Sequence, residues 1–177
     1  MMSDFTSHLS DASMDALRSL LGQPVSIRAN WASVQADEVL VNDIEIACES
    51  SAVAIQHEWL ETPVCAIDYA GLRADTLEGR GLKDESAVYL ASYDLIDSIH
   101  VIEAAEADEV IEGPRKGVAE RVAFDTALLF DSKGSRGLKL SWARHSLTFQ
   151  RYTNSDTLLA ARRELRVRTT ITQQTTA

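Results

Sequence analysis

The spacing of hydrophobic residues changes once along the chain, from a helical period near the N-terminus to a period of two beyond it. At the N-terminus, Met14 and Leu17 lie about one helical turn apart, and Ser10 or Asp11 is placed to cap the free amide groups of that turn. The pattern predicts a helix over residues 11–21, ended by the glycine and the proline that follow it.

Beyond this helix, apolar and polar residues alternate in a succession of short segments. We predict strands over six of them: residues 25–29, 39–48, 53–59, 65–69, 87–93 and 98–103. Because one face of each strand is polar, antiparallel pairing is favoured over a buried parallel sheet. Residues 71–85 are rich in glycine and charge, which predicts a surface loop.

The clearest alternation lies between residues 122 and 149. Three apolar-polar runs are separated by two turns, the first of which contains two glycines. The runs are Val122 to Phe130, Leu138 to Trp142 and Leu147 to Phe149. They predict a meander of three consecutive antiparallel strands.

The C-terminal part predicts a short helix over residues 154–163, followed by a strand over residues 164–172. Residues 1–9 and 173–177 are expected to be flexible. No repeat, low-complexity segment or linker divides the chain, so we expect one domain over residues 1–177. The predicted fold is mainly β (α+β): an antiparallel sheet as a sandwich or a partly open barrel, with short N-terminal and C-terminal helices.

The net charge is −10, and it is unevenly distributed. Residues 1–131 carry 25 acidic and 8 basic side chains, a net −17, whereas residues 132–177 carry 2 acidic and 9 basic ones, a net +7. A nucleic-acid backbone requires a surplus of Lys and Arg, so we expect no nucleic acid as a partner. No apolar run is long enough to cross a membrane, and the N-terminus lacks the features of a secretory signal. We expect a cytoplasmic protein with no membrane association.

The densest group of acids follows residue 93 and contains no Lys or Arg. Its members are Asp94, Asp97, Glu103, Glu106, Asp108, Glu109 and Glu112. Paired carboxylates for hydrolysis need burial that shifts their pKa values apart, and the alanines among these acids indicate a solvated loop or helix instead. The group is therefore favoured as a solvated surface. It is also the best candidate binding surface, because a rigid negative surface attracts a cationic groove on another protein.

No motif for catalysis or cofactor binding is present. Cys48 and Cys65 share strand faces with isoleucines, which predicts buried structural thiols rather than reactive ones. The four histidines lack metal-ligand spacing, and the nucleophilic serine elbow and the phosphate loop are missing. We therefore predict no metal and no cofactor.

The basic tail has two interpretations. Its arginines are candidates for a nucleic-acid patch, but the acidic remainder of the chain would repel a polyanion. We favour an internal role, in which Arg166 and Arg168 on the last strand face the acidic strand that contains Asp43 and Glu45. That strand belongs either to the same chain or to a second subunit.

These features favour a binding protein over an enzyme. The leading hypothesis is an acidic protein-binding module of bacterial origin, an inhibitor of the immunity type or a subunit of an assembly, whose partner has a basic surface or is a second copy. The bacterial origin is inferred from 13 arginines against 4 lysines, the composition expected of a GC-rich genome. The alternative is a small hydrolase-like enzyme with a carboxylate or histidine site.

Overall fold

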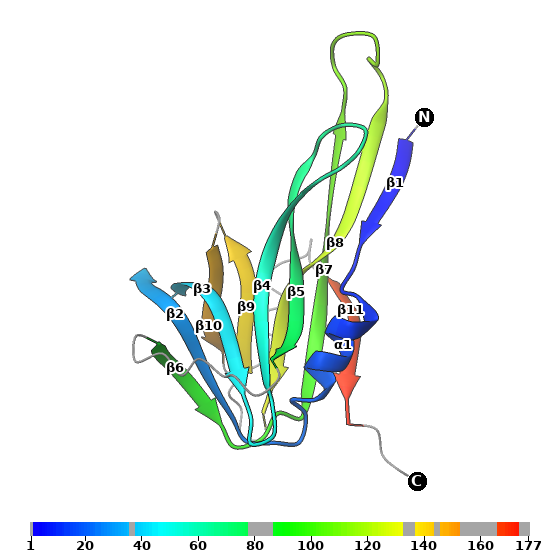
Figure 1. The fold of residues 1–177 in the computed structure, drawn as a ribbon. Coiled ribbons are helices and arrows are strands. Elements are labelled where there is room, and N and C mark those ends of the chain that lie inside the picture. The colour runs from blue at the N-terminus through cyan, green and yellow to red at the C-terminus, as the bar shows by residue number, and fades with distance from the viewer. Residues whose placement is uncertain are drawn as a thin grey trace.

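The computed structural model of this protein describes residues 2–35, 38–77, 87–132, 137–143, 146–152 and 166–173. Within them the chain forms a strongly curved sheet with one helix beside it (Figure 1). The predicted mainly β, antiparallel class is confirmed, and the sheet curls as a half-barrel. Among the described residues, no helix is long and apolar enough to cross a bilayer.

The described elements are one helix and eleven strands. They are β1 (Met2–Ser7), α1 (Asp11–Arg18), β2 (Val25–Gln35), β3 (Glu38–Ala47), β4 (Ala52–Glu61), β5 (Asp68–Leu77), β6 (Val88–Tyr93), β7 (Ser98–Glu109), β8 (Ala119–Asp131), β9 (Gly137–Ala143), β10 (Ser146–Tyr152) and β11 (Arg166–Thr172). The predicted C-terminal helix over residues 154–163 lies outside the described residues.

The hydrogen-bonded order of the main sheet is β11-β7-β8-β9-β10-β3-β2-β6. Strands β8, β9 and β10 are consecutive and antiparallel, which confirms the predicted meander. β4 pairs with β3 and β5, and β1 pairs with β8 in parallel, the one parallel pair among the described strands. Residues 2–7, for which the sequence predicted no element, thus form a strand of the sheet.

The sheet divides where β3 changes partner. One edge of β3 pairs with β10 at Val39–Val41 and with β4 at Ile44–Ala47. Between them, Asp43 has a φ of 38°, a left-handed conformation that Asp tolerates better than most residues. Its carboxylate accepts hydrogen bonds from Asn30 at 2.7 Å and Gln56 at 3.3 Å, which connects three strands at the bend.

Helix α1 packs against β5 and β11, beside the concave face of the sheet. Ser10 caps it by accepting a hydrogen bond from the Ser13 amide at 3.1 Å, as one of the predicted caps requires. Leu17 and Leu20 are fully buried in the main core, where burial of each contributes roughly 1.5–3 kcal/mol. The helical pattern near the N-terminus therefore predicted the one described helix, which ends at Arg18 rather than at residue 21.

Three predictions about strands are wrong. The strand predicted over residues 65–69 begins at Asp68 and continues to Leu77, through the segment assigned to a loop. β7 runs on to Glu109, through residues assigned to a solvated loop or helix. The tail strand β11 pairs with β7 rather than with the strand of Asp43 and Glu45.

The β7–β8 hairpin extends beyond the rest of the sheet, with β1 and the end of the β4–β5 hairpin beside it (Figure 1). We call residues 104–124 of this hairpin the arm, and the remainder of the sheet with α1 the body. Backbone hydrogen bonds close the end of the arm, from Val110 to Val118 at 2.9 Å and from Gly117 to Val110 at 2.9 Å.

Candidate functional site

The seven acidic residues predicted as a binding surface lie in three separate places. Asp94 and Asp97 lie in the connection between β6 and β7, at the end of β7 remote from the arm. Glu103 lies at the base of the arm and is 3% exposed. The other four are exposed on the arm: Glu106, Asp108, Glu109 and Glu112. Only the last four therefore lie together on the arm.

The outer part of the arm is in solvent. Residues 105–109 and 111–117 are exposed, and Ile111 keeps 74% of its surface accessible. The four exposed acids have no ion-pair partner within the described ranges. Three exposed basic residues lie on the same hairpin: Arg115, Lys116 and Arg121. The charge of the arm is thus mixed, which the acidic run alone did not predict.

The register of the hairpin separates these charges onto two faces. Glu106 lies opposite Val122, and Asp108 lies opposite Glu120, so both acids share the face that packs on the β4–β5 hairpin. Arg121 lies opposite Ala107, on the other face. One face of the arm therefore presents the exposed carboxylates of Glu106 and Asp108. On the paired strands of the arm, no Lys or Arg lies on that face.

A second hydrophobic cluster, separate from the main core, holds the arm against the β4–β5 hairpin. Ile67 and Tyr69 contribute from the hairpin, and Val122 and Phe124 from β8. The Tyr69 ring lies 5.2 Å from that of Phe124 and 6.2 Å from that of Phe5 on β1. Aromatic pairs at these separations add to the stabilisation from burial. The arm is therefore supported on one face by the β4–β5 hairpin and along one edge by β1.

Glu120 fixes the same contact with hydrogen bonds. Its side chain is buried, and one oxygen accepts the amides of Val64 at 3.1 Å and Cys65 at 2.8 Å, while Thr62 contributes a side-chain hydrogen bond. Burial opposes ionisation, but the hydrogen bonds outweigh it and hold the pKa of Glu120 below its ordinary value. The carboxylate therefore stays charged and caps the turn at the end of β4.

Two buried carboxylates lie side by side at the base of the arm. A β-bulge in β8 leaves Thr126 without a partner and places Glu103 directly opposite Asp125. Asp125 is 1% exposed, and Arg168 donates to both of its oxygens at 2.7 Å. Arg166 pairs with Glu103. The two arginines of β11 thus neutralise two adjacent acids of their own chain. The predicted pairing of these arginines within the chain is confirmed, but their partners are Glu103 and Asp125 rather than Asp43 and Glu45.

The residues before α1 complete this cluster. The Leu9 amide donates to Asp125 at 2.7 Å, and Nε2 of His8 lies 2.7 Å from a carboxylate oxygen of Glu103. Burial raises the pKa of Glu103, but the hydrogen bonds and charges of Arg166 and His8 more than offset it, so that its pKa lies below the ordinary value. Ionised Glu103 only accepts hydrogen bonds, so Nε2 of His8 donates to it.

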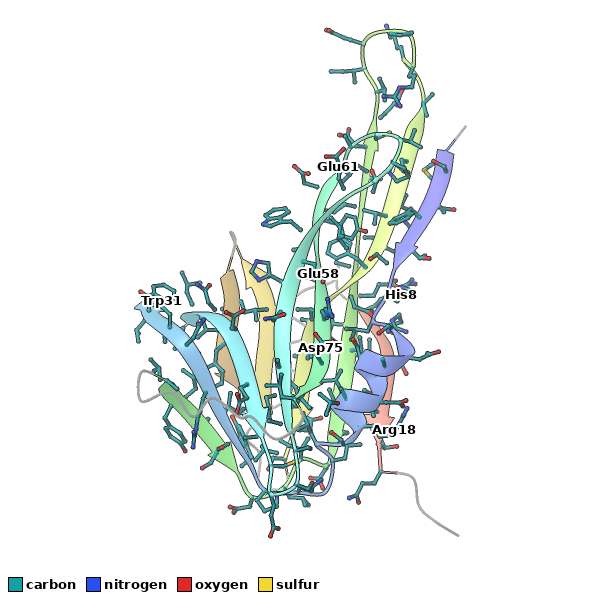
Figure 2. The ribbon with its side chains drawn as sticks, in the orientation of Figure 1. His8, Arg18, Trp31, Glu58, Glu61 and Asp75 are labelled. Atoms are coloured by element: carbon teal, nitrogen blue, oxygen red, sulfur yellow. The ribbon has the colours of Figure 1, made fainter. Side chains whose placement is uncertain are left out.

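A polar cleft of about 370 Å³ opens beside His8, between the start of α1 and the β4–β5 hairpin. Figure 2 shows His8 on one side and Glu58 and Asp75 on the other. Arg73 lies between the two acids, 3.0 Å from Glu58 and 2.7 Å from Asp75. Sequence reasoning missed all four residues, because the connection after β1, strand β4 and strand β5, which supply them, are far apart in the chain.

The cleft has only part of the chemistry of a hydrolase. His8 backed by a buried carboxylate resembles an oriented general base. However, Ser10 and Ser13 bond to each other and to α1 or β5, and within the described residues no serine hydroxyl bonds to His8. The acids Glu58 and Asp75 are held by Arg73 rather than by one another. Among the described residues of the cleft, no nucleophile is therefore hydrogen-bonded to a base.

Both thiols are half-buried rather than fully buried, which corrects the prediction. Cys48 follows the last residue of β3 and packs only at the margin of the main core, and Cys65 lies in the turn that Glu120 caps. The thiol of Cys48 lies 3.2 Å from the Ser51 hydroxyl. Burial raises the pKa of Cys48, but hydrogen bonds from Ser51 and Ser50 lower it further than burial raises it.

An apolar groove of about 380 Å³ forms a second concave surface on the body. Its lining comes from β2, β3, β6 and β10 and includes exposed Val34 and Tyr89.

In the described part of the chain, no group of three His, Cys, Asp or Glu residues is arranged to hold a metal ion. Comparisons with protein-family models, curated proteins and solved structures give no match for the chain.

Proposed function

We propose that the protein is a binding module that docks through its arm onto a partner protein with a basic groove. The observation that carries the proposal is that the arm is firmly supported at its base and along one face, while its outer part remains in solvent. In this proposal the module is bacterial and acts as an inhibitor of the immunity type or as a subunit of an assembly.

The support of the arm suits a docking element. Ordering a loose hairpin on binding would cost roughly 0.5–1.5 kcal/mol for each immobilised side chain, in addition to the backbone cost. The aromatic cluster and the buried Glu120 fix the arm before a partner arrives. More of the contact free energy then contributes to affinity.

The exposed side chains suggest how the arm recognises a partner. Ile111 at its end supplies an apolar anchor, and Glu106 and Asp108 on one face supply negative charge. The net charge of −10 attracts a basic partner at long range, since charge complementarity mainly raises the association rate. The unpaired thiols Cys48 and Cys65 fit a module that acts in the cytoplasm.

Photo-crosslinking from two matched positions tests the proposal. Ile111 on the arm and Val34 on the apolar groove are similarly exposed, at 74% and 77%. With a photoreactive residue at each position in turn, in lysate of the source organism, we expect one stoichiometric protein to be crosslinked from position 111 only. The pair Glu106→Lys and Asp108→Lys should abolish this crosslink, whereas Asp94→Lys should not. Crosslinking from position 34 alone would place the interface on the groove and contradict the proposal.

The hydrolase alternative has less support. Its strongest observation is the His8–Glu103 pair beside a cleft, and Ser10 and Ser13 of that cleft are engaged elsewhere. A binding role does not require those groups to react.

A further inference from the structure

The apolar groove on the body has a chemistry that the docking proposal does not use. Its floor is a row of side chains across three strands, in which Val34 on β2 pairs with Val39 on β3, and Val39 pairs with Phe149 on β10. Directly paired residues point to the same face of a sheet, so the three side chains lie in line. Phe149 is buried in the main core and Val39 packs against that core, whereas Val34 is exposed. The groove is therefore a part of the core that opens to solvent.

Strand β6, at the end of the main sheet, forms the wall of the groove. Leu90 packs partly against the main core, and Val88 and Tyr89 are exposed beside it. The Tyr89 hydroxyl donates a hydrogen bond to Ser92 at 2.9 Å, so the ring rather than the hydroxyl is left for a ligand. The wall thus offers an exposed aromatic ring next to aliphatic side chains.

The lining of the groove carries no charge. No Asp, Glu, Lys, Arg or His is among the described residues that line it, although 25% of the chain is charged. A charged ligand would lose hydration there without gaining a counter-charge, and the net charge of −10 would in addition repel an anion. The lining therefore favours an uncharged, apolar ligand.

The dimensions of the groove suit a small molecule better than a protein. Its volume of about 380 Å³ falls within the range of roughly 300–1,000 Å³ for small-molecule sites. The accessible surfaces of Val34, Val88 and Tyr89 together amount to roughly 300 Å². Each partner in a stable protein complex buries about 800 Å². A second copy or another protein would need much additional surface, which a small molecule does not need.

We propose that this groove binds a small, uncharged aromatic molecule of about two fused rings. One face of the ring system packs on Tyr89, and its edge lies towards Val39 and Phe149. Offset and edge-to-face contacts between aromatic rings stabilise a complex beyond the area that they bury. The proposal goes beyond the docking function and does not depend on the arm.

Titration of the full-length chain with naphthalenemethanol tests the proposal, with amide NMR shifts as the readout. Naphthylmethylamine and naphthoate carry the same rings with a positive and a negative charge. We expect saturable shifts at Ala32, Val39 and Leu90 with the alcohol, and several-fold weaker affinity for both charged probes. No saturable shift with the alcohol, or equal or tighter binding of a charged probe, would overturn the proposal.

Two matched pairs of substitutions at exposed positions locate the ligand. Val34→Thr keeps the shape of the side chain but adds a hydroxyl to the groove, and it should weaken binding of the alcohol about two- to fourfold. Val167→Thr makes the same change on β11, outside the lining, and should have no effect. Tyr89→Ala should weaken binding about two- to tenfold, whereas Tyr89→Phe, which keeps the ring, should not. Equal affinities of Tyr89→Ala and Tyr89→Phe would place the ligand elsewhere and overturn the proposal.

Sedimentation velocity of the same chain distinguishes a ligand site from a contact between copies. We expect the same sedimentation coefficient for the natural chain and for Tyr89→Ala, with and without the alcohol. A dimer that Tyr89→Ala dissociates would make the groove an interface between copies and overturn the proposal. A protein crosslinked from position 34 in the lysate would overturn it in the same way, by placing a protein in the groove.

Discussion

The body and the arm are parts of one sheet, but they are stabilised differently. The body encloses a continuous apolar core in which residues such as Ile27, Ile46 and Leu128 are inaccessible to solvent. The arm has a small aromatic cluster and depends in addition on the buried carboxylate of Glu120 and on those of Glu103 and Asp125 at its junction with the body. A buried charge is stable only with its partners in place, so the arm depends on specific distant contacts, whereas the core of the body depends mainly on area buried.

Removal of β11 should have the largest effect. A chain that ends at residue 165 loses Ile171 from the core and leaves Glu103 and Asp125 buried without their arginines. We expect the free energy of unfolding to fall by at least about 4 kcal/mol in urea denaturation. A chain that ends at residue 173 is the control. Equal denaturation midpoints for the two chains would contradict the role assigned to β11.

Asp125→Ala should have the next largest effect. It leaves the half-buried Arg168 and the Leu9 amide without their acceptor, and we expect a loss of about 3 kcal/mol, in the range for breaking a buried ion pair. Replacing Asp125 and Arg168 together by Leu should recover part of that loss. Asp94→Ala, at an exposed position, should change stability by less than about 0.5 kcal/mol. Equal losses of stability in Asp125→Ala and Asp94→Ala would show that the Asp125–Arg168 ion pair does not stabilise the fold.

The acid sensitivity of the fold should decrease when Glu103 is neutralised. The pKa of Glu103 is lowered by folding, so its ionisation stabilises the protein above the ordinary value of about 4.3, and that contribution is lost as pH falls through the lower folded-state pKa. We expect melting temperatures measured from about pH 6 to pH 3 to fall less steeply for Glu103→Gln than for the natural chain. Glu106→Gln, an exposed control, should keep the original slope. Identical slopes in all three proteins would contradict the assignment to Glu103.

Thiol labelling should give the smallest effect. Cys48 is half-buried and its pKa is lowered by Ser51 and Ser50, so it should react with a thiol reagent in the native state faster than in a Ser51→Ala variant. Cys48→Ala should remove this reaction, and unfolding should expose both thiols fully. Equal native rates with and without the Ser51 hydroxyl would exclude a role for that hydrogen bond.

The alternation of apolar residues predicted most of the body. The β8–β10 meander and the capped α1 follow from local patterns, because each contains enough large apolar residues to define its buried face. Residues 104–112 of the arm were assigned to a solvated loop or helix, since Ala104, Ala105 and Ala107 alternate with acids and give no clear apolar face. Its strand conformation comes from pairing with β8 and from the cluster around Tyr69.

The partners of the buried charges could not be predicted from the sequence. The two arginines of β11 are two positions apart and match any acidic strand with the same period, such as that of Asp43 and Glu45. Their observed partners, Glu103 and Asp125, instead lie opposite each other on two neighbouring strands. The bulge at Thr126, which brings Glu103 opposite Asp125, left no local sign that we recognised. The cleft residues were missed for a related reason, because only the folded chain brings His8 near Glu58 and Asp75.

Amide hydrogen exchange of the free protein tests the central claim that the arm is formed before binding. The hydrogen-bonded amides within residues 104–109 and 119–124 should be protected well above the rates of an unfolded peptide. Glu120→Gln should reduce protection there and at Val64 and Cys65, which it contacts, while the main core of the body stays unchanged. Exchange of the arm at unfolded-peptide rates beside a protected body would contradict the claim.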